Sequence, residues 1–157
     1  MTDEKKMKNA QNMYNSLCKM LDEKGFTYQR HEEDLVITFA ASGEDLPMHF
    51  VLSIDAKWEL IRLLSLIPVV FDEDKRIIGA VATCRANYCL ADGSFDYDYT
   101  EGKVLFRMTS SYADSLISPD LFGYMMAIAY RIVEEYNDQF LALSNGSMTI
   151  DEFFQKN

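Results

Sequence analysis

The stretch Asp92-Gly-Ser-Phe-Asp-Tyr-Asp-Tyr-Thr-Glu-Gly-Lys103 alternates acidic with aromatic residues and ends in Glu-Gly-Lys. This pattern fits either a cation-binding loop or a β-hairpin. If the stretch is counted as a calcium loop from Asp96, the turn glycine, Gly102, falls one place late. The twelfth position is then Arg107, where such a loop requires a bidentate Glu. The stretch therefore predicts a hairpin and no cation site.

A two-residue turn at 101–102 satisfies both faces of this hairpin. It places Tyr97 opposite Phe106 on the buried face and Asp96 opposite Arg107 on the solvent face. The two strands are then expected over residues 94–100 and 103–112. The predicted buried face consists of Phe95, Tyr97, Tyr99, Val104, Phe106 and Met108.

The residues before the hairpin predict one helix followed by strands. Apolar residues recur at helical spacing over about 4–24, and Gly25 suits the left-handed position at a helix end. The pattern then alternates, and hairpin-length breaks separate its segments, so we expect antiparallel neighbours. These three short strands are expected over about 26–28, 35–39 and 48–54.

Residues 58–67 are apolar on both faces apart from a few polar positions. They predict a fourth, more central strand that ends at Pro68 and is covered on both faces. The acids of Asp72–Asp74 then suit a helix start, and a second helix is expected over about 73–90. One apolar stripe of this helix consists of Ile77, Val81, Cys84 and Tyr88.

The last part of the chain predicts two more helical segments. Ser118-Pro-Asp supplies a cap and a first-turn proline for a third helix that reaches about residue 143, before Gly146. The capping-box pattern at Thr149–Glu152 starts a final turn that carries Phe153 and Phe154.

Composition restricts the class of protein. The 157 residues are 48% hydrophobic and 13% aromatic, so we expect one folded domain over residues 1–157. A formal net charge of -10 repels phosphate backbones and anionic headgroups, so neither nucleic acid nor membrane is an expected partner. The start shows no signal-peptide core and no apolar run approaches a membrane span, which favours a cytoplasmic protein.

The residues that could carry chemistry form no constellation. Three cysteines without CxxC spacing favour reduced, buried thiols, with at least one of Cys84 and Cys89 in the core. His31 and His49 fall at outward strand positions without metal-ligand spacing. The seven glycines form no phosphate-binding motif, and a turn and a helix start explain the carboxylate runs. We therefore expect no catalytic residue, metal or cofactor, and no enzyme.

The order of elements and several phrases resemble the YbjN-like family, whose fold is similar to that of type III secretion chaperones. The resemblance is strongest in the second half of the chain. The phrases that carry it are Ile78–Asn87, Gly93–Asp98, Gly102–Arg107, Ile117–Leu121, Tyr136–Phe140 and Gly146–Phe153.

This resemblance implies a two-layer α+β fold with helices on one side of a single antiparallel sheet, in the order α-β(3 or 4)-α-β-β-α. It also implies a homodimer without catalytic residues. Secretion chaperones are small, acidic cytosolic dimers that hold an unfolded client segment along apolar grooves, and this chain shares their size and charge. The partner expected from the resemblance is therefore a protein or peptide client.

Two functions follow as hypotheses. The first is a noncatalytic protein-binding module, chaperone-like or regulatory, which requires apolar surface beyond the core. The second is a small-ligand sensor or small enzyme with a pocket at the sheet edge, which requires convergent polar groups. Helix patterns favour the first, although the surplus on the third helix fits an interface or deeper burial equally well. The candidate dimer or partner surface consists of Ile77, Ile78, Val81, Cys84, Tyr88, Met125 and Met126.

Overall fold

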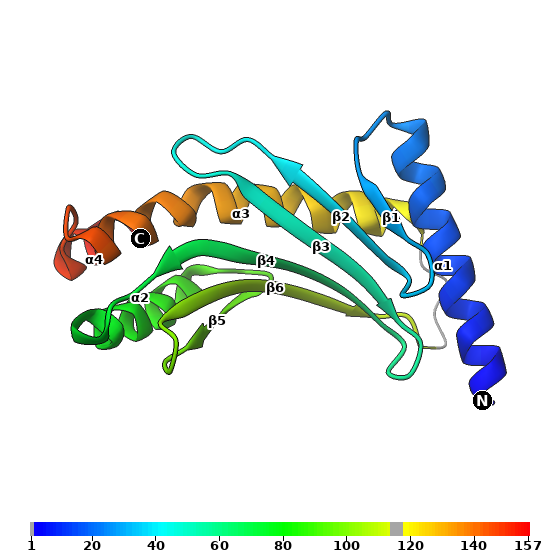
Figure 1. The fold of residues 1–157 in the computed structure, drawn as a ribbon, viewed down its shortest axis with the longest axis horizontal. Helices are drawn as coiled ribbons and strands as arrows, with labels where there is room; N and C mark the ends of the chain where they lie inside the picture. Colours follow the sequence, from blue (N-terminus) through cyan, green and yellow to red (C-terminus); the bar gives the residue numbers. More distant parts are fainter. Residues whose placement is uncertain (1, 114–117) are drawn as a thin grey trace.

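The computed structural model describes residues 2–113 and 118–157. Its helices and strands alternate in the predicted order (Figure 1). They are α1 (Asp3–Glu23), β1 (Gln29–His31), β2 (Val36–Ala41), β3 (Met48–Asp55), β4 (Leu60–Val70), the 3-10 turn η1 (Glu73–Lys75), α2 (Arg76–Cys89), β5 (Ser94–Asp98), β6 (Lys103–Ser111), α3 (Pro119–Asn145) and α4 (Ile150–Lys156).

The strands form one antiparallel sheet in the order β1-β2-β3-β4-β6-β5. α3 runs along one face of this sheet, with α1 at one of its ends and α2 and α4 at the other (Figure 1). Burial alternates along β3, β4 and β6, so one face of the sheet is covered and the other is open. The two-layer α+β fold predicted from the sequence is confirmed.

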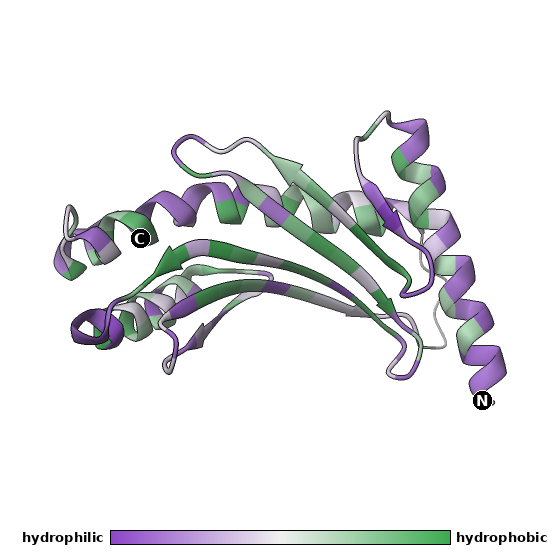
Figure 2. Ribbon diagram, in the orientation of Figure 1, coloured by the Kyte–Doolittle hydropathy of each residue, from purple (hydrophilic) through white to green (hydrophobic). Residues whose placement is uncertain are grey.

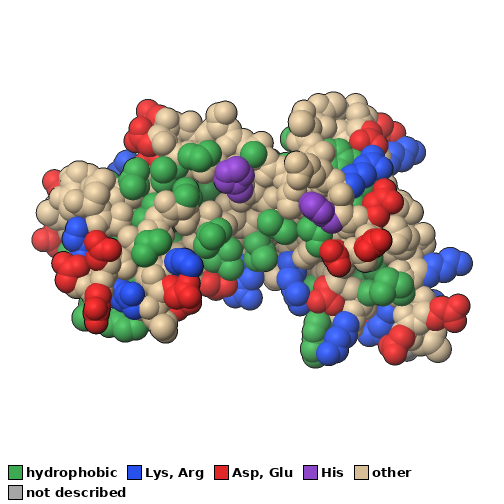
Figure 3. All heavy atoms as spheres, viewed as in Figure 1, with side chains coloured by type: hydrophobic (Ala, Val, Ile, Leu, Met, Phe, Trp, Pro, Cys, Tyr) green, Lys and Arg blue, Asp and Glu red, His purple; other side chains and the backbone are tan. Residues whose placement is uncertain are grey.

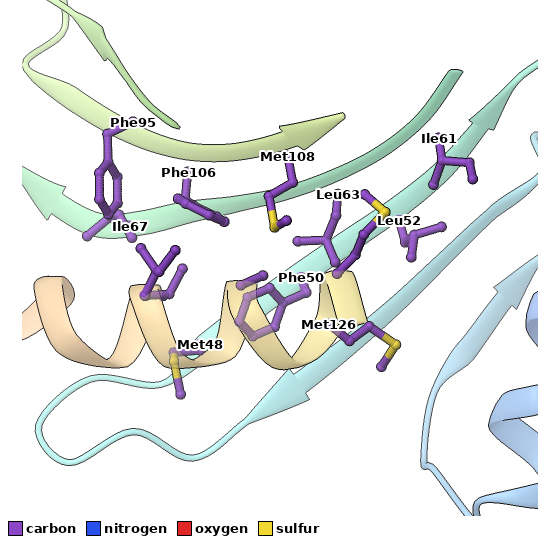
Figure 4. Close-up of a cluster of buried hydrophobic side chains, with 14 of the residues drawn as sticks. Met48, Phe50, Leu52, Ile61, Leu63, Ile67, Phe95, Phe106, Met108 and Met126 are labelled. Atoms are coloured by element: carbon purple, nitrogen blue, oxygen red, sulfur yellow. The ribbon is translucent and has the colours of Figure 1, made fainter. Parts of the chain in front are cut away.

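The core fills the space between α3 and the sheet. Phe50, Leu63, Phe106 and Met126 come from four different elements and point into the same layer (Figure 4). Toward α2 and α4 the core becomes aromatic: the ring of Phe95 lies 5.2 Å from those of Phe106 and Phe140 and 5.3 Å from that of Tyr136, between ring centroids. Edge-to-face pairs of this kind contribute beyond their buried area.

β4 is central, as predicted, but it ends later than predicted, and the expectation that both of its faces are covered is wrong. It continues through Pro68 to Val70, and its register against β6 is irregular between Leu66 and Val70. Such an irregularity accommodates a proline, which has no N–H to donate to the ladder. Although β4 is hydrophobic along nearly its whole length (Figure 2), Leu66 and Val70 are each 54% exposed. Only one face is covered, because the described helices lie on one side of the sheet.

The hairpin β5–β6 has the predicted faces but a different register. Tyr97 lies opposite Val104 and Asp98 opposite Lys103, two residues away from the predicted pairing. The reason is a longer turn over 99–102, which begins at Asp98. The Asp98 carboxylate accepts hydrogen bonds from the backbone N–H groups of residues 100 and 101, and its carbonyl accepts one from Gly102, at φ +71°.

A shift of two residues preserves the alternation of a strand, so the aromatic face stays buried. Phe95, Val104, Phe106 and Met108 are buried as predicted, whereas Tyr99 lies in the turn and is exposed. The ion pair between Asp96 and Arg107 still forms, at 2.9 Å between Oδ2 and Nε, as a diagonal contact instead of a directly opposed pair.

The predicted helix ends are confirmed. Ser118 Oγ accepts a hydrogen bond from the backbone N–H of Asp120, and α3 ends at Gly146 with φ +84°. Thr149 and Glu152 form the reciprocal capping box at the start of α4. α1 ends one residue before Lys24, and Gly25 follows at φ +70°.

Candidate functional site

One side of α2 is apolar and open to solvent. Ile77, Val81 and Tyr88 are 67%, 41% and 82% exposed, and Cys84 between them is exposed as well. Positions i, i+4, i+7 and i+11 form one stripe along a helix. The sequence predicted this stripe, and the structure places its four side chains together on the outward side. We call these four residues the α2 face.

The inward side of α2 is built from small residues. A Cβ atom added at Gly79 would lie 2.6 Å from the Tyr97 hydroxyl and 2.8 Å from the Phe71 ring, so the helix backbone approaches the hairpin closely. Large side chains do not fit at such a distance, and the apolar stripe is therefore left outside. The buried residues of α2 are Gly79, Ala82, Thr83 and Ala86.

The other predicted surface residues are buried or partly buried. Ile78 is partly buried and packs against the core. Met125 and Met126 are only 2% and 6% exposed, so they belong to the core, which is the deeper burial that the sequence allowed as the alternative to an interface. α3 is apolar around most of its circumference because it contacts three strands, β3, β4 and β6, and also α1 and α2.

The cysteines differ in part from the prediction. All three are free thiols, and Cys18 is buried. Cys84 and Cys89 are both exposed, so neither contributes to the core. The Cys89 thiol lies 3.1 Å from the carbonyl oxygen of Asn157, within hydrogen-bonding distance for sulfur. The residues of α2 that are buried are instead the small ones on its inward side.

Asn87 positions the α2 face, although sequence reasoning gave it no role beyond a family phrase. Its side-chain amide donates to the carbonyl of Phe95 at 2.8 Å and accepts from the N–H of Phe95 at 2.7 Å. This pair of bonds attaches the last turn of α2 to the outer edge of β5. An Asn eight residues before an edge-strand Phe is the signal that could have identified it.

Arg85 extends the α2 face toward α4. Its guanidinium lies 5.6 Å from the ring centroid of Tyr88 and 5.3 Å from that of Phe154, the distances of cation–π contacts. Phe154 is itself 43% exposed. The apolar surface around α2 therefore continues onto α4, at the end of the molecule opposite α1 (Figure 1).

A second apolar region lies at the other end of α3, at the edge of the sheet. A groove of about 540 Å³ opens between the end of α1, the edge of β2 and the first half of α3. The sequence predicts a sheet-edge pocket only for a small ligand and does not indicate which residues line it. We call it the edge groove; its lining includes Met20, Lys24, Phe26, Phe39, Met126 and Tyr130.

Comparison with known protein families identifies the family to which this chain belongs. The model of the YbjN family, described as "Putative bacterial sensory transduction regulator", matches residues 14–142. This chain belongs to the YbjN family. The resemblance predicted from the sequence is therefore confirmed, and the match covers both α2 and the edge groove.

A solved structure shares the YbjN fold of this chain. A chain of the crystal structure of the ExsC–ExsE complex superposes with a TM-score of 0.56 over 81% of this chain and 92% of its own length, at 16% sequence identity. At this identity the similarity shows that the two chains share a fold. No curated protein matches the chain in sequence.

In the described part of this YbjN-family chain, the candidate sites are surfaces for apolar contact and contain few reactive groups. Among residues 2–113 and 118–157, no group of three or more His, Cys, Asp or Glu side chains is placed to hold a metal ion. His31 and His49 are exposed, as predicted. Of the described side chains that line the edge groove, Lys24 is the only charged one. No helix in the described ranges is long and apolar enough to cross a membrane.

Proposed function

We propose that this protein is a noncatalytic, chaperone-like or regulatory protein-binding module of the cytoplasm that acts as a homodimer. The observation that carries the proposal is the α2 face, where Ile77, Val81 and Tyr88 expose large apolar side chains on one helix. Family membership and the fold shared with the ExsC–ExsE structure support a protein as the client. The mostly apolar edge groove supports contact with a polypeptide better than polar small-molecule recognition.

The α2 face suits self-association because one patch then buries itself twice across a two-fold axis. If the contact buries roughly 400 Å² of apolar area on each partner, the gross gain at about 25 cal/mol per Å² is ~20 kcal/mol. Association costs roughly 4 to 15 kcal/mol, so such a contact is sufficient for a dimer. Phe154 and the Arg85 stem would extend the contact at its border.

Light scattering at micromolar concentration tests the dimer. The unmodified protein should give about twice the 18.1 kDa chain mass. Ile77→Asp should shift the mass toward that of the monomer, because it places an unpaired charge in the contact. Ile77 is preferable to Ile78, whose partial burial would confound folding with association. Trp58→Asp is the matched control, because Trp58 is 62% exposed but lies outside the α2 face, and it should remain dimeric.

A monomeric unmodified protein would contradict the dimer and leave a one-chain binding domain as the better hypothesis. If the Ile77→Asp and Trp58→Asp variants both remain dimeric, the α2 face is excluded as the contact, and the homodimer itself still stands. Circular dichroism of both variants should match that of the unmodified chain, because both positions are exposed.

A further inference from the structure

β1 pairs with only the first half of β2. Their ladder ends at the pair Gln29 and Thr38, and within the described residues no strand lies beside Phe39–Ala41 on that side. If the ladder continued, Tyr28 would lie opposite Phe39 and Phe26 opposite Ala41. The alternating pattern of the sequence predicts a strand over about 26–28, and this expectation is wrong, because β1 begins only at Gln29. The structure instead leaves a strand edge open.

The segment before β1 is held by α1 instead of β2. The Tyr28 hydroxyl lies 2.8 Å from Asp22 Oδ1 and 3.2 Å from the Cys18 carbonyl, and the N–H of Phe26 donates to the Leu21 carbonyl at 3.0 Å. These bonds fix the segment to the C-terminal end of α1. A slot therefore remains between residues 26–28 and the free edge of Phe39–Ala41.

Hollows flank this slot on both faces of the sheet. The edge groove lies on the helix side, and a second hollow of about 550 Å³ lies on the open side. Thr27, Phe39 and Ala40 line both, so the two hollows meet at the free edge. The surface is notched along its upper outline, between the α1 side and the rest of the molecule (Figure 3). Successive side chains of an added strand point to opposite faces, and this edge provides space on each.

Charged side chains near the slot indicate in which direction a bound segment would run. Beyond Ala41, the β2–β3 loop and α3 line a hollow with five carboxylates, against the single amine of Lys156. Glu44 and Glu134 are drawn together there, because the N–H of Glu44 donates to Glu134 Oε1 at 3.1 Å. Burial, and then the neighbouring Asp45 carboxylate, raise the pKa of Asp138. A cationic side chain would relieve this excess of negative charge.

We propose that Phe39–Ala41 is a docking edge for an extended segment of a partner protein. The segment adds antiparallel to β2, in line with β1, with alternate apolar side chains in the edge groove and a Lys or Arg on its N-terminal side among the carboxylates. Main-chain bonds to the open edge supply affinity, and the groove and the carboxylates supply selectivity. The inference rests on the proposed protein-binding function and names its contact site and the chemistry of the client.

The test uses the full chain and the fluorescent peptide Lys-Arg-Leu-Thr-Val-Thr-Val, whose apolar residues share one face of a strand. Anisotropy titrations should show binding. Ala127→Trp fills the edge groove from an exposed helical position and should weaken binding by about tenfold or more. Ala91→Trp adds the same side chain at an exposed position outside the groove and should leave the affinity unchanged.

The role of the carboxylates is tested by changing the charge on the protein and, separately, on the peptide. Glu44→Lys should weaken the Lys-Arg peptide several-fold, and should leave the affinity of Ser-Ser-Leu-Thr-Val-Thr-Val unchanged. Hydrogen exchange should show that the peptide protects the backbone of Phe39–Ala41 and not that of α2. Equal binding by the Ala127 and Ala91 tryptophan variants, or protection confined to α2, would overturn the proposal.

Two further outcomes separate this inference from the proposed function. If light scattering shows the α2-dependent dimer but the peptide leaves Phe39–Ala41 unprotected, the docking edge fails and the dimer stands. If Phe39–Ala41 becomes protected with increasing protein concentration and no peptide, a second copy occupies the edge, and the partner-segment proposal is overturned.

Discussion

Asn87 carries more of the structure than its size suggests. A single side-chain amide satisfies both backbone groups of Phe95, a residue that is buried at the edge of the sheet. Its two bonds to Phe95 take the place of the bonds that a neighbouring strand would make. The last turn of α2 therefore covers the outer edge of β5 at this residue. The orientation of the α2 face therefore depends on this residue.

Replacement of Asn87 by Ala should lower the free energy of unfolding by about 2–3 kcal/mol, because two buried backbone groups lose their partners. Urea denaturation measures this loss. Asn15→Ala is the control, since Asn15 lies on an exposed surface of α1 and its side chain accepts a hydrogen bond from that of Gln11; it should change stability by less than about 0.5 kcal/mol. Equal effects of the two substitutions would show that the Asn87 bonds contribute nothing specific.

At the level of elements, helix ends and the order of helices and strands along the chain could be predicted, because caps and periodicity are local signals. The register of β5–β6 could not, because Asp98 closes a longer turn than Glu101-Gly102 alone suggests. The α2 face illustrates a different limit. Its stripe of large apolar residues is visible in the sequence, but only the close approach of Gly79 to Phe71 shows that the stripe faces solvent.

The edge groove was harder to foresee for the same reason. Its lining comes from α1, β2 and α3, and the slot exists because Tyr28 bonds to α1 instead of extending β1. The alternation at residues 26–28 is compatible with either arrangement. The hydrogen bonds of the Tyr28 hydroxyl to Asp22 and Cys18 decide between them, and the alternation of apolar residues does not report those bonds.

Two helical glycines offer a matched test of how closely α2 packs. Gly79→Ala should destabilise the protein by about 1–3 kcal/mol, because its Cβ would overlap Tyr97 and Phe71. Gly123→Ala should instead stabilise it by up to about 1 kcal/mol, since among the described residues its Cβ would meet only Lys24 Nζ, at an ordinary 3.6 Å, and alanine favours the helix. Thermal unfolding of the two variants should move in opposite directions. A stabilising Gly79→Ala would contradict the close approach.

At the scale of the whole molecule, the chain presents apolar regions at both ends of α3. The α2 face and Phe154 lie at one end, and the edge groove lies at the other. The open face of the sheet between them contributes further exposed aliphatic side chains, including Leu66 and Val70. With a formal net charge of -10, long-range repulsion between copies keeps such a surface from indiscriminate association.

Metal removal should leave this fold unchanged. Incubation with EDTA should not alter the melting temperature, because every candidate ligand cluster in the sequence fails on number or spacing. Differential scanning calorimetry with and without chelator measures this. A fall of several degrees that one divalent ion restores would reveal a structural site.

The length of α3 also determines how far apart the two edge grooves of a dimer would lie. Its 27 residues span roughly 40 Å, and a dimer joined at α2 would hold its two edge grooves up to about 80 Å apart. An extended polypeptide covers at most ~3.3–3.6 Å per residue, so at the full separation one client could engage both grooves only if its two docking segments were at least roughly 22–24 residues apart. Clients with that spacing would bind bivalently and gain avidity, whereas clients with a single segment would bind each groove independently.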